Sequence, residues 1–280
     1  MSDGKAALQG AFGRVALLDI DRQVVTHAHP QCHVLIKVGG ADSTFRVKDR
    51  DYPLAEGTAV LVNSWEPHAY PHTPAAPRST VLALYVNPAW LSGIERGFAA
   101  SAAAGFFARP CVSLTSGVRR RAYEMAEALL AGAEADGQHL ALLADLMIAI
   151  VEDFSEWRRL PAVDRRSVPD FRVRQAIRFL ENNLGRDFTL ADVARAAGLS
   201  RPHLFEVFRR NTGVTPQLYY NALRMEAAYS ALPGAGETIA GLSASLGFAA
   251  PGAFTRFFRN NLGIAPRDYR RSLRETGLLG

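Results

Sequence analysis

The feature that most constrains this 280-residue chain is a segment near its C-terminal end that occurs twice. Residues 208–219 recur as residues 258–269, fifty positions further on, with Gly, Pro and Tyr at matching places. Upstream, residues 190–198 match residues 239–247 at a spacing of 49. Two copies are too few for a solenoid of stacked repeats. The sequence therefore predicts a duplicated supersecondary unit beyond about residue 170.

Each copy has the sequence of two helices joined by a short turn. Thr189 and Asp192 form the capping-box pattern that starts a helix, and Gly198 can adopt the positive φ that ends it. Ser200 is a favourable N-cap for a second helix, whose outer positions carry Arg. The second copy keeps this layout. A helix, a short turn with Gly and a second helix with an Arg-bearing face together indicate a helix-turn-helix.

The charge is unevenly distributed along the chain. Residues 1–160 carry a net charge of −2, whereas residues 161–280 carry 17 Arg against 10 acidic residues, a net of +7. This asymmetry predicts an anionic partner for one domain only. Arg suits bidentate contacts with phosphates and guanine edges, although a GC-rich genome also favours Arg codons.

The tandem pattern resembles the C-terminal signature of the AraC/XylS family of bacterial transcription regulators over about 100 residues. The resemblance implies a sensing barrel followed by a DNA-binding domain. The sequence departs from the family pattern at Gly252, Ala253 and Glu206, so the side chains that recognise bases cannot be inferred from relatives. The matching residues are Gly247-Phe248, Phe254, Phe258-Arg259, Gly263, Pro266 and Tyr269-Arg270.

The second helix of each unit supplies the candidate DNA contacts. In the major groove, the Glu206 carboxylate can accept a hydrogen bond from N4 of cytosine or orient a neighbouring Arg. Alternatively, it forms an ion pair with Arg209 or Arg210 on the helix surface and takes no part in base recognition. Because Gly252 and Ala253 offer almost no side chain, the second unit is predicted to be the less selective one. The candidate contacts are Ser200, Arg201, His203, Glu206, Arg209, Arg210, Thr255, Arg256, Arg259 and Asn260.

The rest of the chain changes its periodicity twice. Short β-rich runs separated by turns fill residues 12–87, and the period is helical from about residue 88 to 160. We predict a multidomain α+β fold, in which a cupin-like β-barrel with following helices precedes an all-α domain of two helix-turn-helix units. The predicted boundaries are 1–95 for the barrel, 96–160 for a helical dimerisation segment, 161–169 for a linker and 170–280 for the DNA-binding domain.

The N-terminal half contains a histidine motif that resembles the two cupin motifs, in which imidazoles and a Glu converge on a metal. If alternation holds, His27, His29 and His33 lie on one face of a strand, and His68 follows from the second motif. His33 stands at the position where the first cupin motif has its Glu. The predicted ligands of a divalent metal, Zn²⁺ or Fe²⁺, are the four imidazoles of His27, His29, His33 and His68, or two imidazoles together with the Glu66 carboxylate. The alternative is a set of vestigial ligands in a small-molecule sensor.

Aromatic residues flank the second motif, either at the mouth of a ligand pocket or as packing at a barrel rim. The predicted effector-binding residues are His27, His29, His33, Trp65, Glu66, His68 and Tyr70. The apolar stripe of residues 140–154 exceeds what one barrel face needs, which favours a homodimer. The alternative is that it packs on the barrel.

These observations predict a sequence-specific DNA-binding transcription regulator that responds to a small-molecule effector in the barrel. Activation is the expected mode of control, and double-stranded DNA, the effector, a second copy and RNA polymerase are the expected partners. The alternatives are a metal-dependent cupin enzyme fused to a DNA-binding module and an architectural DNA binder with an inert barrel. The motif-one Glu is missing, so we expect no enzyme. Two cysteines and the absence of a long apolar run predict a cytoplasmic protein without membrane contact.

Overall fold

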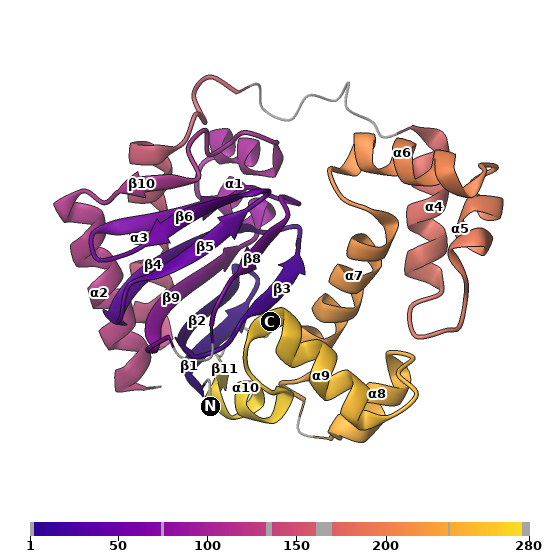
Figure 1. The fold of residues 1–280 in the computed structure, drawn as a ribbon. Helices are drawn as coiled ribbons and strands as arrows, with labels where there is room; N and C mark the ends of the chain where they lie inside the picture. Colours follow the sequence, from indigo (N-terminus) through magenta and orange to yellow (C-terminus); the bar gives the residue numbers. More distant parts are fainter. Residues whose placement is uncertain (1–2, 74–75, 133–135, 161–169, 235, 276–280) are drawn as a thin grey trace.

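The computed structural model describes residues 3–73, 76–132, 136–160, 170–234 and 236–275. An N-terminal β-rich domain precedes a C-terminal helical domain (Figure 1). The predicted linker, residues 161–169, lies outside the described residues. Among the helices that are described, none is both long and apolar enough to cross a bilayer.

The β-rich domain consists of two sheets. The larger sheet has the order β10-β7-β4-β9-β2-β1-β11, and the smaller has the order β3-β8-β5-β6. The strands are β1 (Asp3–Gly10), β2 (Gly13–Ile20), β3 (Val24–His27), β4 (Cys32–Gly40), β5 (Ser43–Val47), β6 (Arg50–Leu54), β7 (Thr58–Val62), β8 (His68–Tyr70), β9 (Ser79–Val86), β10 (Cys111–Ser113) and β11 (Leu273–Glu275).

The larger sheet is buried on both faces. In β4, Val34 and Ile36 join a core formed with the helices that follow the barrel, whereas Leu35 joins a second core that includes Phe45 and Tyr70 of the smaller sheet. A strand covered on both sides needs apolar residues at every position, which explains why these strands read as continuous hydrophobic runs.

Four helical elements follow the sheets. They are α1 (Pro88–Ile94), the 3₁₀ turn η1 (Arg96–Ala102), α2 (Ser116–Ala131) and α3 (Asp136–Phe154). Leu143, Met147, Ile150 and Val151 of α3 are all buried in the core shared with α2 and the larger sheet. The stripe that suggested a dimer interface therefore packs against the barrel, as the alternative interpretation held.

Strands from outside the predicted barrel segment also join the larger sheet. β10 pairs antiparallel with β7, and β11, at the end of the helical domain, pairs parallel with β1. The four predicted domain boundaries stay predictions.

The helical domain contains two helix-turn-helix units. Its helices are α4 (Phe171–Asn182), α5 (Leu190–Ala196), α6 (Arg201–Thr212), α7 (Pro216–Ala231), α8 (Ile239–Ser245), α9 (Pro251–Leu262) and α10 (Pro266–Ser272). The capping box of Thr189 and Asp192 is formed, and Gly198 turns at a φ of +65°. Ser200 stands at the N-cap of α6, but its side chain makes no capping hydrogen bond there. Only its position matches the prediction.

The helix α7 runs between the two units and passes along the open edge of the β-rich domain (Figure 1). The second unit shares one hydrophobic core with the barrel, in which Phe254 and Phe258 lie in the same cluster as Val81 and Tyr85. The first unit has a separate core; of the barrel residues that the structure describes, only Ala28 joins it, with Trp65 packed at its edge.

Candidate functional site

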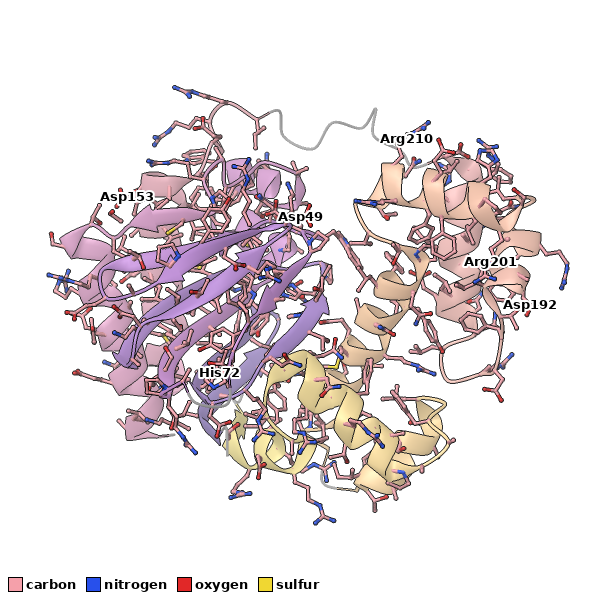
Figure 2. The ribbon with its side chains drawn as sticks, in the orientation of Figure 1. Asp49, His72, Asp153, Asp192, Arg201 and Arg210 are labelled. Atoms are coloured by element: carbon pink, nitrogen blue, oxygen red, sulfur yellow. The ribbon has the colours of Figure 1, made fainter. Side chains whose placement is uncertain are left out.

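The second helix of each unit presents a polar outer face. Leu204, Val207 and Phe208 of α6 are buried, as are Phe254 and Phe258 of α9. The predicted DNA contacts lie on the opposite faces, where Arg201 and Arg210 are labelled for the first unit in Figure 2. Thr255 is half-buried, and the other contacts are exposed, namely Ser200, Arg201, His203, Glu206, Arg209, Arg210, Arg256, Arg259 and Asn260.

Glu206 is engaged on its own helix. Its Oε1 accepts a hydrogen bond from Nη2 of Arg210 at 2.6 Å, one helical turn away. Both side chains are exposed, so the pair contributes little to stability. This contact is the surface pair that the sequence left open as the alternative to base readout.

The four predicted metal-ligating histidines come together in space. The ring centroids of His27 and His68 lie 4.2 Å apart, those of His29 and His68 4.8 Å, and those of His29 and His33 5.2 Å. The expectation that three of them share one strand face is wrong, because β3 ends at His27 and β4 begins at Cys32. His29 lies on the connection between these strands. The cluster therefore arises where β3, the connection after it, β4 and β8 meet.

The imidazoles of this cluster are held in the neutral form. Burial lowers the pKa of His27 to about 4. Burial, followed by repulsion from neighbouring histidines, lowers the pKa values of His29, His33 and His68 well below the usual range. Neutral imidazoles keep a lone pair on one ring nitrogen, which is the form that accepts hydrogen bonds and binds metals.

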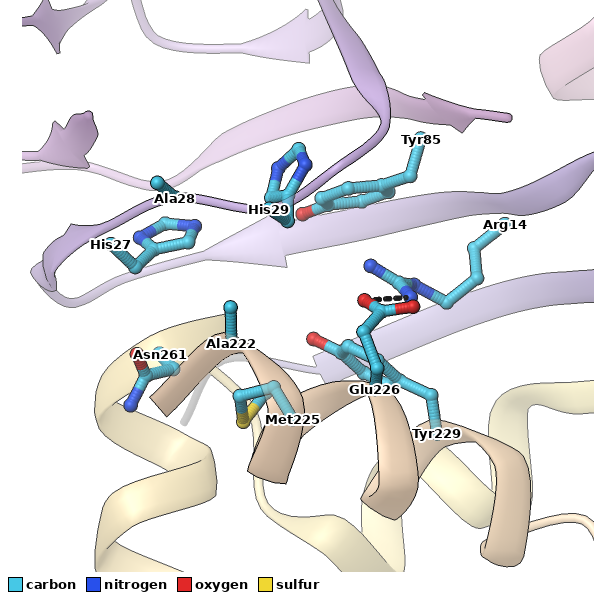
Figure 3. A pocket seen from close by; sticks show the side chains of 10 residues that line it. All are labelled: Arg14, His27, Ala28, His29, Tyr85, Ala222, Met225, Glu226, Tyr229 and Asn261. Carbon is cyan, nitrogen blue, oxygen red and sulfur yellow. Dashed lines mark hydrogen bonds and ion pairs between the residues drawn. The ribbon is translucent and has the colours of Figure 1, made fainter. Parts of the chain in front are cut away.

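A cavity separates this cluster from the helical domain (Figure 3). From the barrel side, His27, His29, Arg14 and Tyr85 face into it, and α7 forms the opposite wall. The lining residues from the helical domain are Ala222, Met225, Glu226, Tyr229 and Asn261.

An ion pair crosses this cavity between the domains. Arg14 Nη1 donates to Glu226 Oε1 at 3.0 Å, and Gln31 Nε2 donates to Glu226 Oε2 at 2.9 Å. The Arg14 guanidinium also lies 3.6 Å from the ring centroid of Tyr229 and 4.6 Å from that of Tyr85. Burial opposes the charge of Arg14, but the adjacent Glu226 carboxylate prevails and raises the pKa of the guanidinium. Arg14 therefore carries a buried positive charge whose carboxylate partner belongs to the other domain.

The remaining predicted effector residues are dispersed. Trp65, at a φ of +58°, stacks on Tyr219 of α7 with centroids 4.5 Å apart and planes 9° from parallel. Glu66 accepts from the backbone and side chain of Asn63 and pairs with Lys48 Nζ at 2.8 Å. Tyr70 lies on β8 and packs in the core, not in a turn at a pocket mouth.

Trp65 and Glu66 border a second opening between the domains, of about 690 Å³. Arg210, Asn211 and Tyr219 border it from the first unit. The predicted effector residues are therefore divided between two interdomain cavities and the barrel core.

The sequence analysis did not identify several residues that line the first cavity, chiefly Arg14, Tyr85 and Glu226. Arg14 could have been noticed in the sequence, because it is a charged residue inside the apolar run of β2. Nothing in the sequence distinguishes Glu226, because a Glu on a helix is ordinarily exposed to solvent.

The fold and the sites together define a class of protein: a DNA-binding regulator with an N-terminal ligand-binding domain. Residues 19–148 match the family model of the AraC-like ligand binding domain, and residues 193–272 match that of a helix-turn-helix domain. The chain belongs to the AraC family of transcription regulators. The predicted fold class is confirmed, and the fused-enzyme alternative is not supported.

Curated relatives agree with this assignment. The chain is 29% identical over 98 residues to the lactose operon transcription activator of Staphylococcus xylosus, a match covering 35% of each chain. It is 25% identical over 247 residues, 86% of each chain, to the transcriptional activator RhaS of Enterobacter sp. strain 638. The chain spans only about a third of the first of these relatives.

Among solved structures, apo ToxT K231A from Vibrio cholerae has a similar fold. It matches with a TM-score of 0.55 at 13% identity, over 95% of this chain and 99% of that one. The two-domain arrangement is therefore found in a solved structure, although identity at this level carries no information on ligands.

Proposed function

We propose that the chain is a ligand-responsive transcription activator in which a small molecule, bound between the histidine cluster and α7, controls how α6 and α9 engage DNA. It acts in the cytoplasm as a homodimer, recruits RNA polymerase and catalyses no reaction. The family assignment supports DNA binding and a ligand-binding domain, and the interdomain cavity supports the site of control.

The observation that carries this proposal is the double role of α7. This helix joins the two helix-turn-helix units, and its residues Met225 and Glu226 also line the cavity next to His29. Its 16 residues span roughly 24 Å at 1.5 Å per residue. Two recognition helices held by such a rod can enter successive major grooves of one duplex face. A molecule that shifts α7 would therefore change the spacing of both reading helices.

DNA binding is tested first, with the purified full chain and genomic fragments in mobility-shift assays. We expect fragments to be retained, with an affinity that falls as salt increases because phosphate contacts release counterions. Arg201→Ala and Arg256→Ala should weaken binding, whereas Arg120→Ala on the exposed face of α2 serves as the matched control. An absence of any shift at low salt would contradict the proposal.

Effector control is tested with a thermal-shift screen of small acids, sugars, amines and aromatic compounds. A molecule that binds only the native state must stabilise it. The expected hit raises the unfolding temperature and changes DNA affinity, and both effects disappear in Met225→Trp, which fills the cavity. Arg256→Ala should keep the thermal shift while it weakens DNA binding. A hit that Met225→Trp leaves unaffected would locate the effector elsewhere.

Dimerisation is tested by light scattering of the purified chain. The buried stripe of α3 is unavailable for it, so the exposed face of α2 is the proposed contact, where Leu130 is 55% exposed. Leu130→Glu should convert the dimer into a monomer, and Glu127→Gln on the same helix should not. A wild-type chain that is monomeric at micromolar concentration would rule out the dimer.

A further inference from the structure

The strongest unexplained feature of the molecule is the orientation of the imidazoles in the histidine cluster. We infer that His27, His29 and His68 bind one divalent transition-metal ion, Zn²⁺ being the best match, through their Nε2 atoms. All three ligands belong to the β-rich domain, so binding of the ion can be measured separately from binding of DNA.

The hydrogen bonds of the cluster fix the tautomers. Nδ1 of His27 lies 2.8 Å from the Val25 carbonyl, Nδ1 of His29 lies 3.1 Å from that of Gln31, and Nδ1 of His68 lies 2.8 Å from that of Glu66. A carbonyl oxygen can only accept, so each Nδ1 must carry the proton. Each Nε2 then holds the lone pair. A ligating histidine typically donates its other ring N–H in this way to a backbone carbonyl.

The distances suit a single ion. One ring nitrogen from each of His27, His29 and His68 lies within 4.8 Å of the other two. At a Zn–N distance of about 2.0–2.1 Å, nitrogens on a tetrahedral ion lie roughly 3.3 Å apart. Small rotations about the side-chain bonds would close the difference, without a change in the strands.

The unsatisfied polar atoms provide a second, independent observation. His29 is 5% exposed, and its Nε2 has no hydrogen-bond partner among the described residues. A buried acceptor without a partner is costly and calls for an explanation. An ion at the centre of the three imidazoles would satisfy it.

The donor set selects the kind of ion. Three neutral imidazoles suit Zn²⁺ and its transition-metal neighbours, whereas Mg²⁺ and Ca²⁺ require oxygen ligands. Glu66, the nearest acidic residue in sequence, is already engaged by Asn63 and Lys48. A three-histidine site leaves a fourth position free for water or another donor.

His33 stands beside the three ligands rather than among them. Its Nδ1 lies 3.3 Å from Nε2 of His68 and donates to it, which holds the His68 ring in place when no ion is bound. His27 and His29 also line the interdomain cavity, so the free position would open toward Met225 and Glu226 of α7. An exchangeable ligand there would contact both domains.

The test measures metal binding by the full chain, purified without a histidine tag. After equilibrium dialysis against micromolar Zn²⁺, we expect one ion per chain by elemental analysis, and a rise in unfolding temperature that Mg²⁺ does not produce. Co²⁺ in the same site should show the intense visible absorption of a tetrahedral complex. A wild-type chain that retains no Zn²⁺ would overturn the inference, whatever the variants do.

Two variants locate the ion. His29→Gln and His68→Gln should weaken Zn²⁺ binding by more than the roughly 10–100-fold that loss of an outer partner costs. His72→Gln, a matched change in the same domain, should leave it unchanged. Circular dichroism confirms that each variant is folded. Equal Zn²⁺ retention by the wild type and both ligand variants would place the ion elsewhere and overturn the site. DNA binding is measured separately, so a failure of either proposal is recognised without the other.

Discussion

The two helix-turn-helix units descend from one repeated pattern, but they are attached to the molecule in different ways. Phe258 of the second unit is buried in a core that continues into the sheets of the barrel. Phe208, its equivalent in the first unit, is buried in a core built almost entirely within that unit. Apart from Ala28, the first unit meets the barrel mainly through the stack of Trp65 on Tyr219.

This difference gives the molecule a fixed unit and a looser unit. Apolar burial stabilises in proportion to the area removed from water, so the second unit is held far more strongly than the first. We expect a regulatory signal to change mainly the position of the first unit relative to the second. Since α7 joins them, its contacts with the barrel determine that position.

The largest expected effect comes from the matched pair Phe258→Ala and Phe208→Ala. Each truncation should lower the free energy of unfolding by about 3–5 kcal/mol, because each ring is fully buried. Phe258→Ala should increase hydrogen exchange in β2 and β9 as well as in α9, whereas Phe208→Ala should increase it only in α4 to α6 and at the start of α7. If Phe208→Ala loosens the sheets equally, the two units are attached alike and the comparison fails.

A smaller effect is expected when the interdomain ion pair is removed. Glu226→Gln leaves the buried Arg14 without its carboxylate, which should destabilise the docking of α7 by about 1.5–3 kcal/mol. We expect faster hydrogen exchange in α7 and an altered DNA affinity without ligand. Glu127→Gln, the same change on an exposed face of α2, is the control. Unchanged exchange in α7 would mean that the ion pair does not hold the helix.

Loss of the aromatic stack should cost less. Trp65→Ala removes a contact worth about 0.5–1.5 kcal/mol beyond its buried area and should release the first unit from the barrel. Exchange should then increase in α6 and at the start of α7, with α9 unaffected. Tyr219→Phe preserves the stacked ring and should behave like the wild type. Equal release of α9 would contradict the separate attachment of the units.

The smallest effect concerns Glu206. Because it pairs with Arg210 on the helix surface, Glu206→Gln should change stability by only about 0.2–0.5 kcal/mol. Assayed across a randomised operator library, it should change DNA affinity uniformly, without altering base preference. A changed preference at one operator position would show that Glu206 reads a base. The same library tests whether the first unit is the more selective one.

The helical domain could be predicted closely because its signals are local. The capping box at Thr189, the positive φ of Gly198 and the buried stripe of α6 depend on residues within a few positions of one another. The second unit repeats the turn glycine, at Gly247, and the buried stripe, with Phe254 and Phe258 of α9. The barrel was predicted less completely, because β3, β6 and β8 are short strands whose burial depends on which strand lies beside them.

The histidine cluster was predicted for a reason that proved wrong. Alternation along one strand would have aligned His27, His29 and His33, but the chain leaves β3 after His27. The residues meet because β3 pairs with β8, with His27 opposite His68, and because His29 lies on the connection to β4. Strand register, which the sequence of one strand does not specify, brought them together.

The sequence by itself determined the class of protein, because capping, turn and periodicity signals act between neighbours along the chain. Only the tertiary structure decided where the two domains communicate. Arg14 and Glu226 are 212 positions apart, and neither residue type reveals its partner. Their meeting depends on how α7 docks against the barrel, which follows from the apolar surface that the second unit and the sheets bury together.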